Sequence, residues 1–385
     1  MSQLSIRAEL TKDGHTTVLN VPCNDYGIDI ALQNLGEIDM TKTEQLCSRL
    51  GGDIPELAIL TDQFIDIAAL NFLAKRLDSF DDREMNQFKA AVIATNAVGL
   101  KDMINLTFNL HNYTLITDFS DTAKIGRMHR MNVEGAIPIE ADNGYNYRAL
   151  GESVIASDKK TVTPYGVLVE NGLPVREVYN GKTFPEYLYE ECVFEVTIGY
   201  GNRLEYLYLP CAQSAIDRAV HRIDAVNIAD CSLEDIEEDR FTQDFLREIQ
   251  PDFSIADIGS LNILSSALVD IEASNMKKLI AVCDYAEVQD FEKAALIAKN
   301  IDSFEFAPDI RSTEGFGEYL IRDSGYYAYD EELNDYYDYE SLGIDTMQNQ
   351  YGDFTSYGYV GIRDDITLEE IIGENENEEM TMGGM

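Results

Sequence analysis

Carboxylates interleaved with tyrosines form the part of this sequence whose residue types could do chemistry. Residues 323–362 contain nine acidic residues and nine tyrosines, but neither lysine nor arginine. Carboxylates in such a run could serve as general acids and bases, bind a cation, or together present a surface of negative charge. The tyrosines distinguish the run from a solvated acidic tail, because they allow it to fold and to hold its carboxylates in place.

A second run, residues 233–252, carries eight acidic residues against two arginines. For any single acid, a solvated surface position is the plainer interpretation. Two features favour a binding surface: the charge is nearly all of one sign over long stretches, and self-repulsion at this charge destabilises the compact state. We expect these carboxylates to face a binding partner: Glu234, Asp235, Glu237, Glu238, Asp239, Asp330, Glu331, Glu332, Asp335, Asp338, Glu340 and Asp345.

The whole chain of 385 residues has 70 acidic and 29 basic residues, a formal net charge of −41. This balance excludes most nucleic-acid binding and argues against docking on anionic membranes, since both require basic residues. Disorder is excluded as well, because 45% of the residues are hydrophobic. The negative charge is unevenly distributed: residues 1–172 hold 15 basic and 24 acidic residues, whereas residues 173–385 hold 14 and 46.

Sequence motifs for catalysis or metal binding are absent. The chain has no phosphate-binding glycine loop, no HExxH or GxSxG motif, no EF-hand spacing, and only four dispersed histidines. Its six cysteines form no CxxC pair, and those in apolar runs, such as Cys192 and Cys283, are expected to be buried thiols of a reducing compartment. We therefore predict no catalytic residue, no cofactor and no metal. Without a signal peptide or membrane span, the sequence predicts a cytoplasmic protein.

The elements that must position the acidic runs occur twice along the chain. Short motifs recur in order at a nearly constant spacing: Pro22-Cys23 as Pro210-Cys211, Ile28-Asp29 as Ile216-Asp217, Leu70-Asn71 as Leu261-Asn262, and Thr163-Pro-Tyr165-Gly166 as Thr355-Ser-Tyr357-Gly358. Such recurrence predicts a tandem duplication. We expect copy 1 at residues 1–172, a linker at 173–189, a strongly acidic copy 2 at 190–362, and an acidic, disordered tail at 363–385.

The hydrophobic pattern of each copy predicts an α+β fold. We expect an elongated array of small subdomains: a hairpin plus a helix, a helical middle, and a Tyr- and Gly-rich C-terminal part. Hairpin strands are expected at 4–10 and 16–21, and again at 193–198 and 204–209. Middle helices are expected at 66–77, 83–94 and 100–110, and again at 257–268, 274–283 and 291–300.

One motif of copy 2 resembles the antirestriction motif of the ArdA proteins, which has a Tyr-x-Asp-Tyr-x-x-x-Gly-Arg-Asp core followed by a strand with Gly and Phe. It is Leu333-Asn-Asp-Tyr-Tyr-Asp-Tyr-Glu-Ser-Leu-Gly343-Ile-Asp345, with Gly352-Asp-Phe-Thr-Ser-Tyr-Gly-Tyr-Val360 after it. Leu261-Asn262 with Asn300-Ile-Asp-Ser-Phe304, and their counterparts in copy 1, are similar to the family's middle domain. The resemblance covers nearly the whole chain, once in each copy.

ArdA proteins are small acidic DNA mimics, so the resemblance implies an antirestriction protein that is not an enzyme. It implies as partner a type I restriction–modification enzyme, whose DNA-binding groove, chiefly in the methyltransferase core, would be occupied. Family members are elongated, have three small domains and dimerise, which implies a homodimer or an intrachain pseudo-dimer. The motif's Arg is replaced by Ile344 in copy 2 and by Glu152 in copy 1, and copy 1 lacks the motif's acids.

Two other functions also fit an acidic surface. An acidic adaptor or inhibitor could bind another basic DNA-binding protein, such as a histone-like protein or a nuclease outside restriction systems. An enzyme could use pairs of Glu and Asp for acid–base chemistry or a metal, although no matching constellation is present. A Ca²⁺-binding surface is a weaker variant, because loosely arranged carboxylates bind such ions poorly without a loop that converges them.

Within the motif, the acids and the other residues are expected to differ in role. Tyr337, Tyr339, Leu342 and Gly343 are expected to determine the fold rather than to contact a partner, since they recur in copy 1 where the acids do not. In an extended electrostatic contact the energy is spread over many groups. Single acids are therefore expected to matter little, and four or five changed together to matter greatly.

Overall fold

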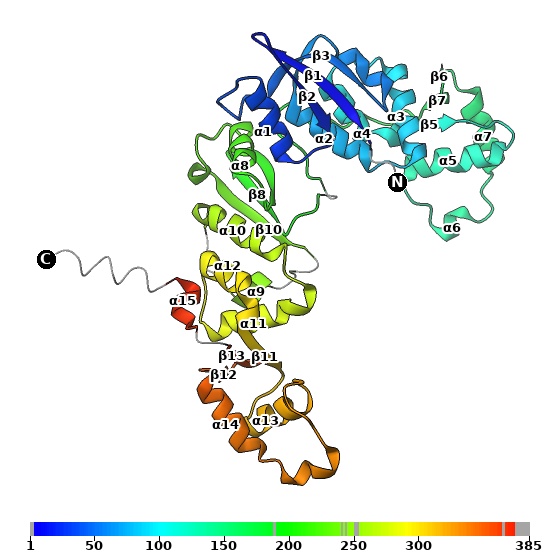
Figure 1. Ribbon diagram of the computed structural model, residues 1–385. Coiled ribbons are helices and arrows are strands. Elements are labelled where there is room, and N and C mark those ends of the chain that lie inside the picture. Colours follow the sequence, from blue (N-terminus) through cyan, green and yellow to red (C-terminus); the bar gives the residue numbers. More distant parts are fainter. Residues whose placement is uncertain are drawn as a thin grey trace. The chain divides into compact units, whose positions relative to one another are not determined.

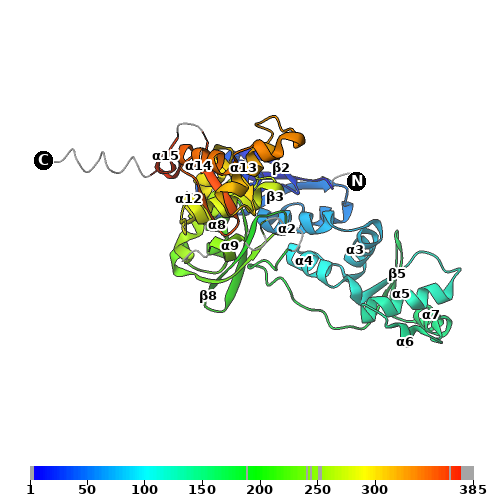
Figure 2. The same cartoon turned by 90° about the horizontal axis from the view of Figure 1, so that it is seen from below.

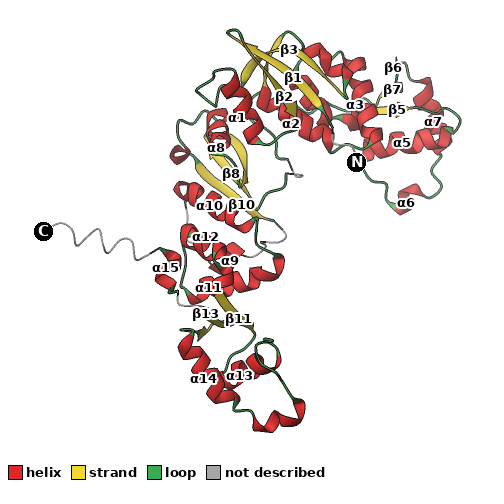
Figure 3. Cartoon of the chain, in the orientation of Figure 1, coloured by secondary structure: helices red, strands yellow, loops and turns green. Residues whose placement is uncertain are grey.

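The computed structural model describes residues 4–187, 190–239, 242, 245–249, 254–363 and 366–373. Helices alternate along the chain with small antiparallel sheets of three or four strands (Figure 3). The α+β fold class predicted from the sequence is therefore confirmed. Within the described residues, no helix is both long enough and apolar enough to cross a membrane.

The chain divides into two compact units. The first unit comprises residues 1–189, 200–206 and 212–227, and the second unit comprises residues 190–199, 207–211 and 228–385. Helix α8 (Gln213–Arg222) lies in the first unit, although its residues fall in the range expected for copy 2. The boundary between the two units therefore differs from the expected boundary between the copies.

The first unit contains a sheet with strand order β2-β1-β3-β4, three helices after it, and a second sheet with order β5-β7-β6. Helices α5 and α7 lie together at the end of this second sheet (Figure 1). Besides α8, the strands and helices are β1 (Ile6–Lys12), β2 (His15–Val21), α1 (Asp25–Asn34), β3 (Glu44–Gly52), β4 (Gln63–Asp66), α2 (Ile67–Asp78), α3 (Asp82–Thr95), α4 (Leu100–Phe108), β5 (Tyr113–Ile116), α5 (Thr122–Glu134), α6 (Ile139–Asp142), α7 (Tyr147–Ala156), β6 (Lys160–Thr163) and β7 (Gly166–Glu170).

The rest of the chain repeats this order of elements. A sheet with order β10-β8-β9 is followed by four helices, the first of them the five-residue α9, and then by a sheet with order β11-β13-β12. The strands and helices are β8 (Phe194–Tyr200), β9 (Arg203–Leu209), β10 (Ser232–Glu238), α9 (Phe245–Ile249), α10 (Ile258–Leu268), α11 (Met276–Tyr285), α12 (Phe291–Lys299), β11 (Phe304–Pro308), α13 (Thr313–Arg322), α14 (Tyr339–Asn349), β12 (Asp353–Phe354), β13 (Gly358–Ile362) and α15 (Leu368–Ile372).

Local sequence signals explain these elements. The β1–β2 hairpin turns at Asp13 and Gly14, which both have positive φ, of 48° and 84°, as a tight two-residue hairpin turn requires. Helix α3 begins with a capping box between Asp81 and Glu84, which satisfies backbone N–H groups that the first turn leaves free. The hairpins and middle helices predicted from the sequence are confirmed, with boundaries that differ by a few residues.

An asparagine joins the first hairpin of each copy to its middle helices. The Nδ2 of Asn71 donates to the carbonyl of Cys23 at 2.9 Å, and its Oδ1 accepts from the N–H of Cys23 at 2.8 Å. Asn262 makes the same two hydrogen bonds with Cys211, at 2.9 Å each. Each amide therefore satisfies a backbone donor and acceptor at the strand end, where no ladder partner does.

A tyrosine in the last hairpin of each copy reaches back to an earlier acid. The hydroxyl of Tyr165 donates to Glu56, and that of Tyr357 donates to Glu248. Burial, and then the hydrogen bond to the carboxylate, raises the pKa of both phenols to about 12. The two phenols thus remain protonated donors at any physiological pH.

Residues 173–187, hereafter the strap, contain no helix or strand but are packed against the helices of copy 1. The Oδ1 of Asn105 accepts from the N–H of Tyr179 at 2.9 Å, and its Nδ2 donates to the carbonyl of Tyr179 at 2.7 Å. The ring of Phe184 stacks on Phe72 with centroids 5.1 Å apart. The described part of the segment expected to be a linker is therefore held by side chains of α2 and α4.

The segment expected to be a disordered tail, residues 363–385, begins with described structure. Thr367 and Glu370 form a capping box that starts α15, and Gly373 ends the helix with a φ of 75°. Residues 374–385 lie outside the described residues, so the disorder expected there stays a prediction.

Candidate functional site

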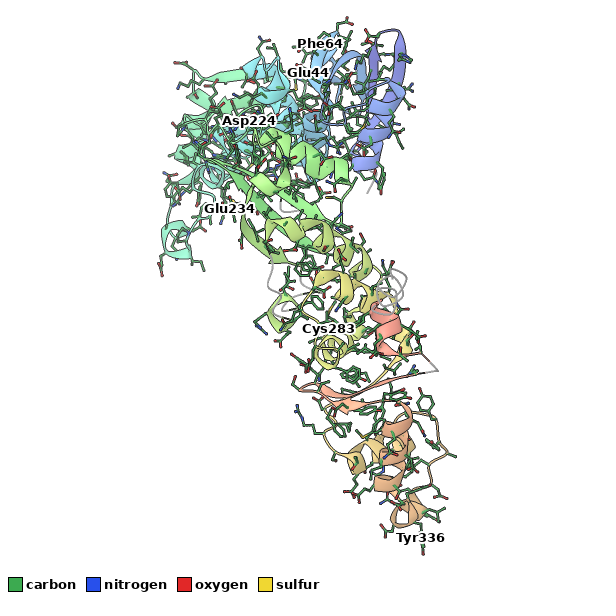
Figure 4. All side chains as sticks on the ribbon, turned by 90° about the vertical axis from the view of Figure 1, so that its left-hand side faces the viewer. Glu44, Phe64, Asp224, Glu234, Cys283 and Tyr336 are labelled. Carbon is green, nitrogen blue, oxygen red and sulfur yellow. The ribbon has the colours of Figure 1, made fainter. Side chains whose placement is uncertain are left out.

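Residues 323–362, hereafter the acidic lobe, contain the 3₁₀ helix Glu331–Tyr336 together with α14, β12 and β13. All seven predicted carboxylates of this lobe belong to exposed residues: Asp330, Glu331, Glu332, Asp335, Asp338, Glu340 and Asp345. Tyr336 is 83% exposed and lies at the free end of the lobe (Figure 4). The lobe therefore presents carboxylates and an aromatic ring on one small body.

Two of these acids also begin helices. The carboxylate of Asp330 accepts from the N–H of Glu332 at 3.0 Å, and that of Asp338 accepts from the N–H of Ser341 at 3.0 Å. Hydrogen bonds from the backbone and side chain of Ser341 lower the pKa of Asp338. The N–H of Asp330 in turn donates to the hydroxyl of Tyr337 at 3.0 Å. These acids are thus held in place, and Asp338 stays charged to a lower pH than a free carboxyl.

Asp338 should make the stability of the acidic lobe decrease as the pH falls. Because its pKa is lowered on folding, its stabilisation is fully present above its unfolded pKa of about 3.9 and is lost as pH falls through the folded pKa. Asp338→Asn keeps an N-cap but loses the charge, so at pH 7 we expect it to unfold at a slightly lower temperature than wild type, and Asp338→Ala at a lower temperature still. Thermal unfolding from pH 7 to pH 2 should show the wild type losing its difference from Asp338→Asn in acid. Parallel curves at all pH values would contradict the role of this carboxylate.

A polar network around Asn334 fixes the segment between α13 and α14. Its Oδ1 accepts from the guanidinium of Arg322, from the hydroxyl of Tyr339 at 2.8 Å, and from the hydroxyl of Tyr329 at 3.3 Å. The Arg322 guanidinium also lies over both rings, 5.4 Å from the centroid of Tyr329 and 5.8 Å from that of Tyr339. Cation–π attraction and hydrogen bonding thus act on the same rings, which holds the acid-bearing turn in one conformation.

Two glycines allow α13 and α14 to touch backbone to backbone. A Cβ added to Gly343 would lie 2.0 Å from the carbonyl oxygen of Thr313, and one added to Gly317 would lie 1.8 Å from that of Tyr339. The two helices lie side by side in Figure 1 and in Figure 2. Leu342 packs against the apolar cluster beside them. Gly343 thus has a steric reason to be in the motif, independent of any partner.

The five predicted acids of the second run lie on or next to β10, an edge strand of its sheet. Glu234, labelled in Figure 4, is exposed, as are Asp235 and Glu237. Glu238 instead accepts from the N–H of Leu246 at 2.9 Å. Charged residues on an edge strand also oppose pairing with a second chain, which is an alternative reason for their presence.

Asp239 also differs from the three exposed acids of β10. Its carboxylate accepts from the N–H and the hydroxyl of Thr242, each at 2.8 Å. Asp239 is half-buried, and its hydrogen bonds order the chain that leaves the strand. The structure thus separates three outward-facing acids of this run from two that support the backbone.

The first unit has a similar frame without the acids. Asn146 caps α7, where Asp338 caps α14, and Arg148 is exposed on the first turn of α7. The guanidinium of Arg130 lies 4.1 Å from the ring centroid of Tyr145, and its Nη1 donates to the hydroxyl of Tyr147 at 3.2 Å. An arginine that contacts two tyrosines therefore occurs both beside α7 and beside α14. Exposed carboxylates at the N-cap and in the first turn occur at α14, but not at α7.

Three residues in or next to the acidic lobe were missed in the sequence. Asn334 and Arg322 hold the acid-bearing turn, and Tyr336 is exposed rather than packed in the fold. The recurrence of motifs along the sequence contained a signal for the last of these, since Tyr336-Tyr337 aligns with Gly144-Tyr145. A tyrosine without a counterpart in copy 1 serves something other than the shared fold.

A hollow lined by ionisable groups lies elsewhere, in the first unit. A cavity of about 840 Å³ is lined by the β1–β2 turn, by β3 and by α8. Charges of both signs line it, and some of them are paired: Lys12 with Glu37, and Arg222 with Glu205 at 2.8 Å. Within the part of the chain that the structure describes, no group of three or more His, Cys, Asp or Glu is placed to hold a metal ion.

The cysteines are free thiols. Cys283 is buried as expected, and burial raises its pKa to about 12. Cys192 is only half-buried, so the expectation of a fully buried thiol is wrong at this position. Burial nevertheless raises the pKa of Cys192 to about 11. Reactivity requires the thiolate, so such thiols are poor nucleophiles at neutral pH.

We compared the chain with known proteins, and a match covers both β10 and nearly all of the acidic lobe. No protein of curated function matches the chain. A family model does match, that of the antirestriction protein (ArdA), over residues 204–361. This range starts in β9, includes β10 and extends to the last residues of the acidic lobe. The region of the chain that carries both acidic surfaces is therefore similar to the ArdA antirestriction family.

Proposed function

We propose that the chain is a tandem pair of ArdA-like copies, at residues 1–172 and 190–362. Strand order supports this, since β2-β1-β3 corresponds to β9-β8-β10 and β5-β7-β6 corresponds to β11-β13-β12. The amide bridges of Asn71 and Asn262 support it independently, because each joins the same two elements with the same atoms. The family match lies in copy 2, so the assignment of copy 1 rests on these recurrences.

The function proposed for the pair is antirestriction without catalysis: the acidic lobe occupies the DNA-binding groove of a type I restriction–modification enzyme and excludes DNA. This places the protein in the cytoplasm, where such enzymes meet DNA. One observation carries the proposal. The region similar to the ArdA family ends in a lobe whose seven predicted carboxylates are exposed, in a stretch without lysine or arginine.

Charge spacing explains why such a lobe would compete with DNA. Duplex DNA carries one negative charge per roughly 1.7 Å of its axis, and proteins bind it by neutralising phosphates with Lys and Arg. Carboxylates one helical turn apart lie roughly 5–6 Å apart at Cβ. Glu332 and Asp335 lie one turn apart in the 3₁₀ helix, where residues three apart fall on the same face, and Glu340 lies in the first turn of α14. The lobe can therefore offer a basic groove several anions at once.

The proposed contact residues fall into two groups. The lobe supplies its seven exposed carboxylates, with Tyr336 as an aromatic contact of the kind that is enriched in protein interfaces. The edge strand β10 supplies Glu234, Asp235 and Glu237. Glu238 and Asp239 support this strand through their backbone hydrogen bonds, so they act on the partner indirectly.

Direct binding to a purified type I methyltransferase core tests this proposal. We expect inhibition of DNA methylation that added DNA relieves, because both ligands use one groove. Without DNA present, the dissociation constant should rise on the order of 100-fold or more between about 50 mM and 200 mM salt, as release of counterions requires. Methylation unaffected at low salt and large molar excess would refute the proposal. Equal binding to unrelated basic DNA-binding proteins would instead support a general acidic adaptor.

A further inference from the structure

Helices α1 and α8 form a joint within the first unit, and the joint is antiparallel. The carboxylate of Asp29 accepts from the hydroxyl of Ser214 and from Nη1 of Arg218, both at 2.6 Å. Nη2 of Arg218 donates to Asp25 at 3.2 Å. Residues earlier in α1 thus meet residues later in α8, and Figure 1 shows the two helices next to each other.

Arg218 is the centre of this joint. It is only 3% exposed, and the side chain of Asp29 is 13% exposed. A buried guanidinium held by two carboxylates is satisfied only while both acids stay in place, and removing one side of such a pair is strongly destabilising. The joint therefore depends on the buried Arg218 and its two carboxylates, and not only on contact between exposed side chains.

The two helices occupy the same place in their copies, since Ile28-Asp29 of α1 corresponds to Ile216-Asp217 of α8. An antiparallel pair of equivalent helices contains two half-contacts related by a two-fold axis. One half-contact is the ionic one, between Asp25 and Asp29 and the pair Ser214 and Arg218. The other would join Tyr26 and Ile30 to Gln213 and Asp217.

This second half-contact contains no ion pair. Gln213 donates to Asp217 of its own helix at 3.0 Å. Tyr26 and Ile30 are 66% and 56% exposed. The two half-contacts thus differ in chemistry and in burial, because a buried cation stands at Arg218 where α1 has the exposed Ile30.

We propose that the α1–α8 joint is a recognition surface specific for the unlike helix, so that copy 1 pairs with copy 2 and not with another copy 1. Two α1 helices would bring four carboxylates together without a cation. Two α8 helices would offer each Arg218 one carboxylate, that of Asp217, in place of two. Only the unlike pair gives the arginine both acids and neutralises those of α1. The proposal rests on the tandem repeat proposed above, and not on antirestriction activity.

Charge exchange in the full chain tests the joint. Hydrogen–deuterium exchange should show α1 and α8 opening at least 100-fold more often in Arg218→Glu. Combining it with Asp25→Lys and Asp29→Lys should restore most of the protection, because the charges are exchanged. Asp217→Lys is the matched control: it changes the equivalent, exposed acid, which among the described residues makes no ion pair with α1, and should leave protection within about threefold of wild type.

The outcomes separate the proposal from a general loss of folding. If Arg218→Glu does not fold, recovery of folding in the triple variant still supports the joint. Arg218→Lys keeps the positive charge but not the bidentate donors of the guanidinium, so it should show an intermediate loss of protection. Equal effects of Arg218→Glu and Asp217→Lys, or no recovery in the triple variant, would overturn the proposal. Inhibition of methylation is measured separately, so a failed antirestriction assay leaves this result unchanged.

Discussion

Replacing five exposed carboxylates of the acidic lobe by their amides is expected to weaken binding to a type I methyltransferase core on the order of 100-fold. Each exposed ion pair contributes roughly 0.2–1 kcal/mol, so the effect appears only when several are removed together. Asp330 and Asp338 are left unchanged, because they cap helices. The substituted residues are Glu331, Glu332, Asp335, Glu340 and Asp345.

The salt dependence gives this prediction a second readout. Five fewer negative charges in the contact should make the plot of log affinity against log salt shallower by about four to five. A control with the same change of net charge replaces five exposed acids of copy 1 and should bind as wild type does. Equal losses in both variants would mean that net charge, and not the lobe, determines binding. The control residues are Asp82, Glu140, Glu152, Asp158 and Glu170.

Gly343→Ala is expected to unfold the acidic lobe, with a cost of about 3 kcal/mol or more. The added Cβ would lie 2.0 Å from the carbonyl oxygen of Thr313, which belongs to the backbone and cannot rotate away as a side chain would. Helices α13 and α14 would have to separate, which would release the turn that carries the carboxylates. Binding to the methyltransferase should be lost with the lobe's structure, as followed by circular dichroism and by hydrogen exchange in α14.

Two other glycines serve as controls for this change. At Gly151, the counterpart in copy 1, an added Cβ would lie 1.8 Å from the carbonyl oxygen of Thr122. Gly151→Ala should therefore destabilise the first unit and leave protection of α14 unchanged. At Gly259, within α10, an added Cβ meets nothing within 4 Å, so Gly259→Ala should stabilise slightly, by about 0.5–1 kcal/mol. A Gly343→Ala protein with wild-type protection in α14 would contradict the close-packing argument.

The secondary structure could be predicted from the sequence because its signals are local. Alternating apolar residues and an Asp-Gly turn are enough for the first hairpin, and helical spacing with caps such as Asp81 and Asp290 is enough for the middle helices. The exposure of the acids in the motif could also be predicted, because the stretch is rich in carboxylates and has no lysine or arginine. These features depend on residues a few positions apart, which a single sequence displays directly.

What could not be predicted depends on contacts between distant residues. Arg218 sits in an ordinary amphipathic helix, and only the folded chain brings it to Asp25 and Asp29. The run of acids at β10 likewise gives no sign that Glu238 and Asp239 face the backbone while their neighbours face solvent. Periodicity identifies a helix or strand, but it does not say which long-range partner satisfies a charge.

The strap has a consequence for how this protein can be inherited. A gene that ended after residue 172 would encode a copy 1 in which Phe72 has lost the ring of Phe184 and Asn105 has lost its backbone partner. A gene that started at residue 190 would encode an Arg218 without its two aspartates. Neither half is a finished module that recombination could exchange at the point where the repeats meet. A gene divided at either point would therefore encode chains that lack side-chain contacts which hold the first unit together here.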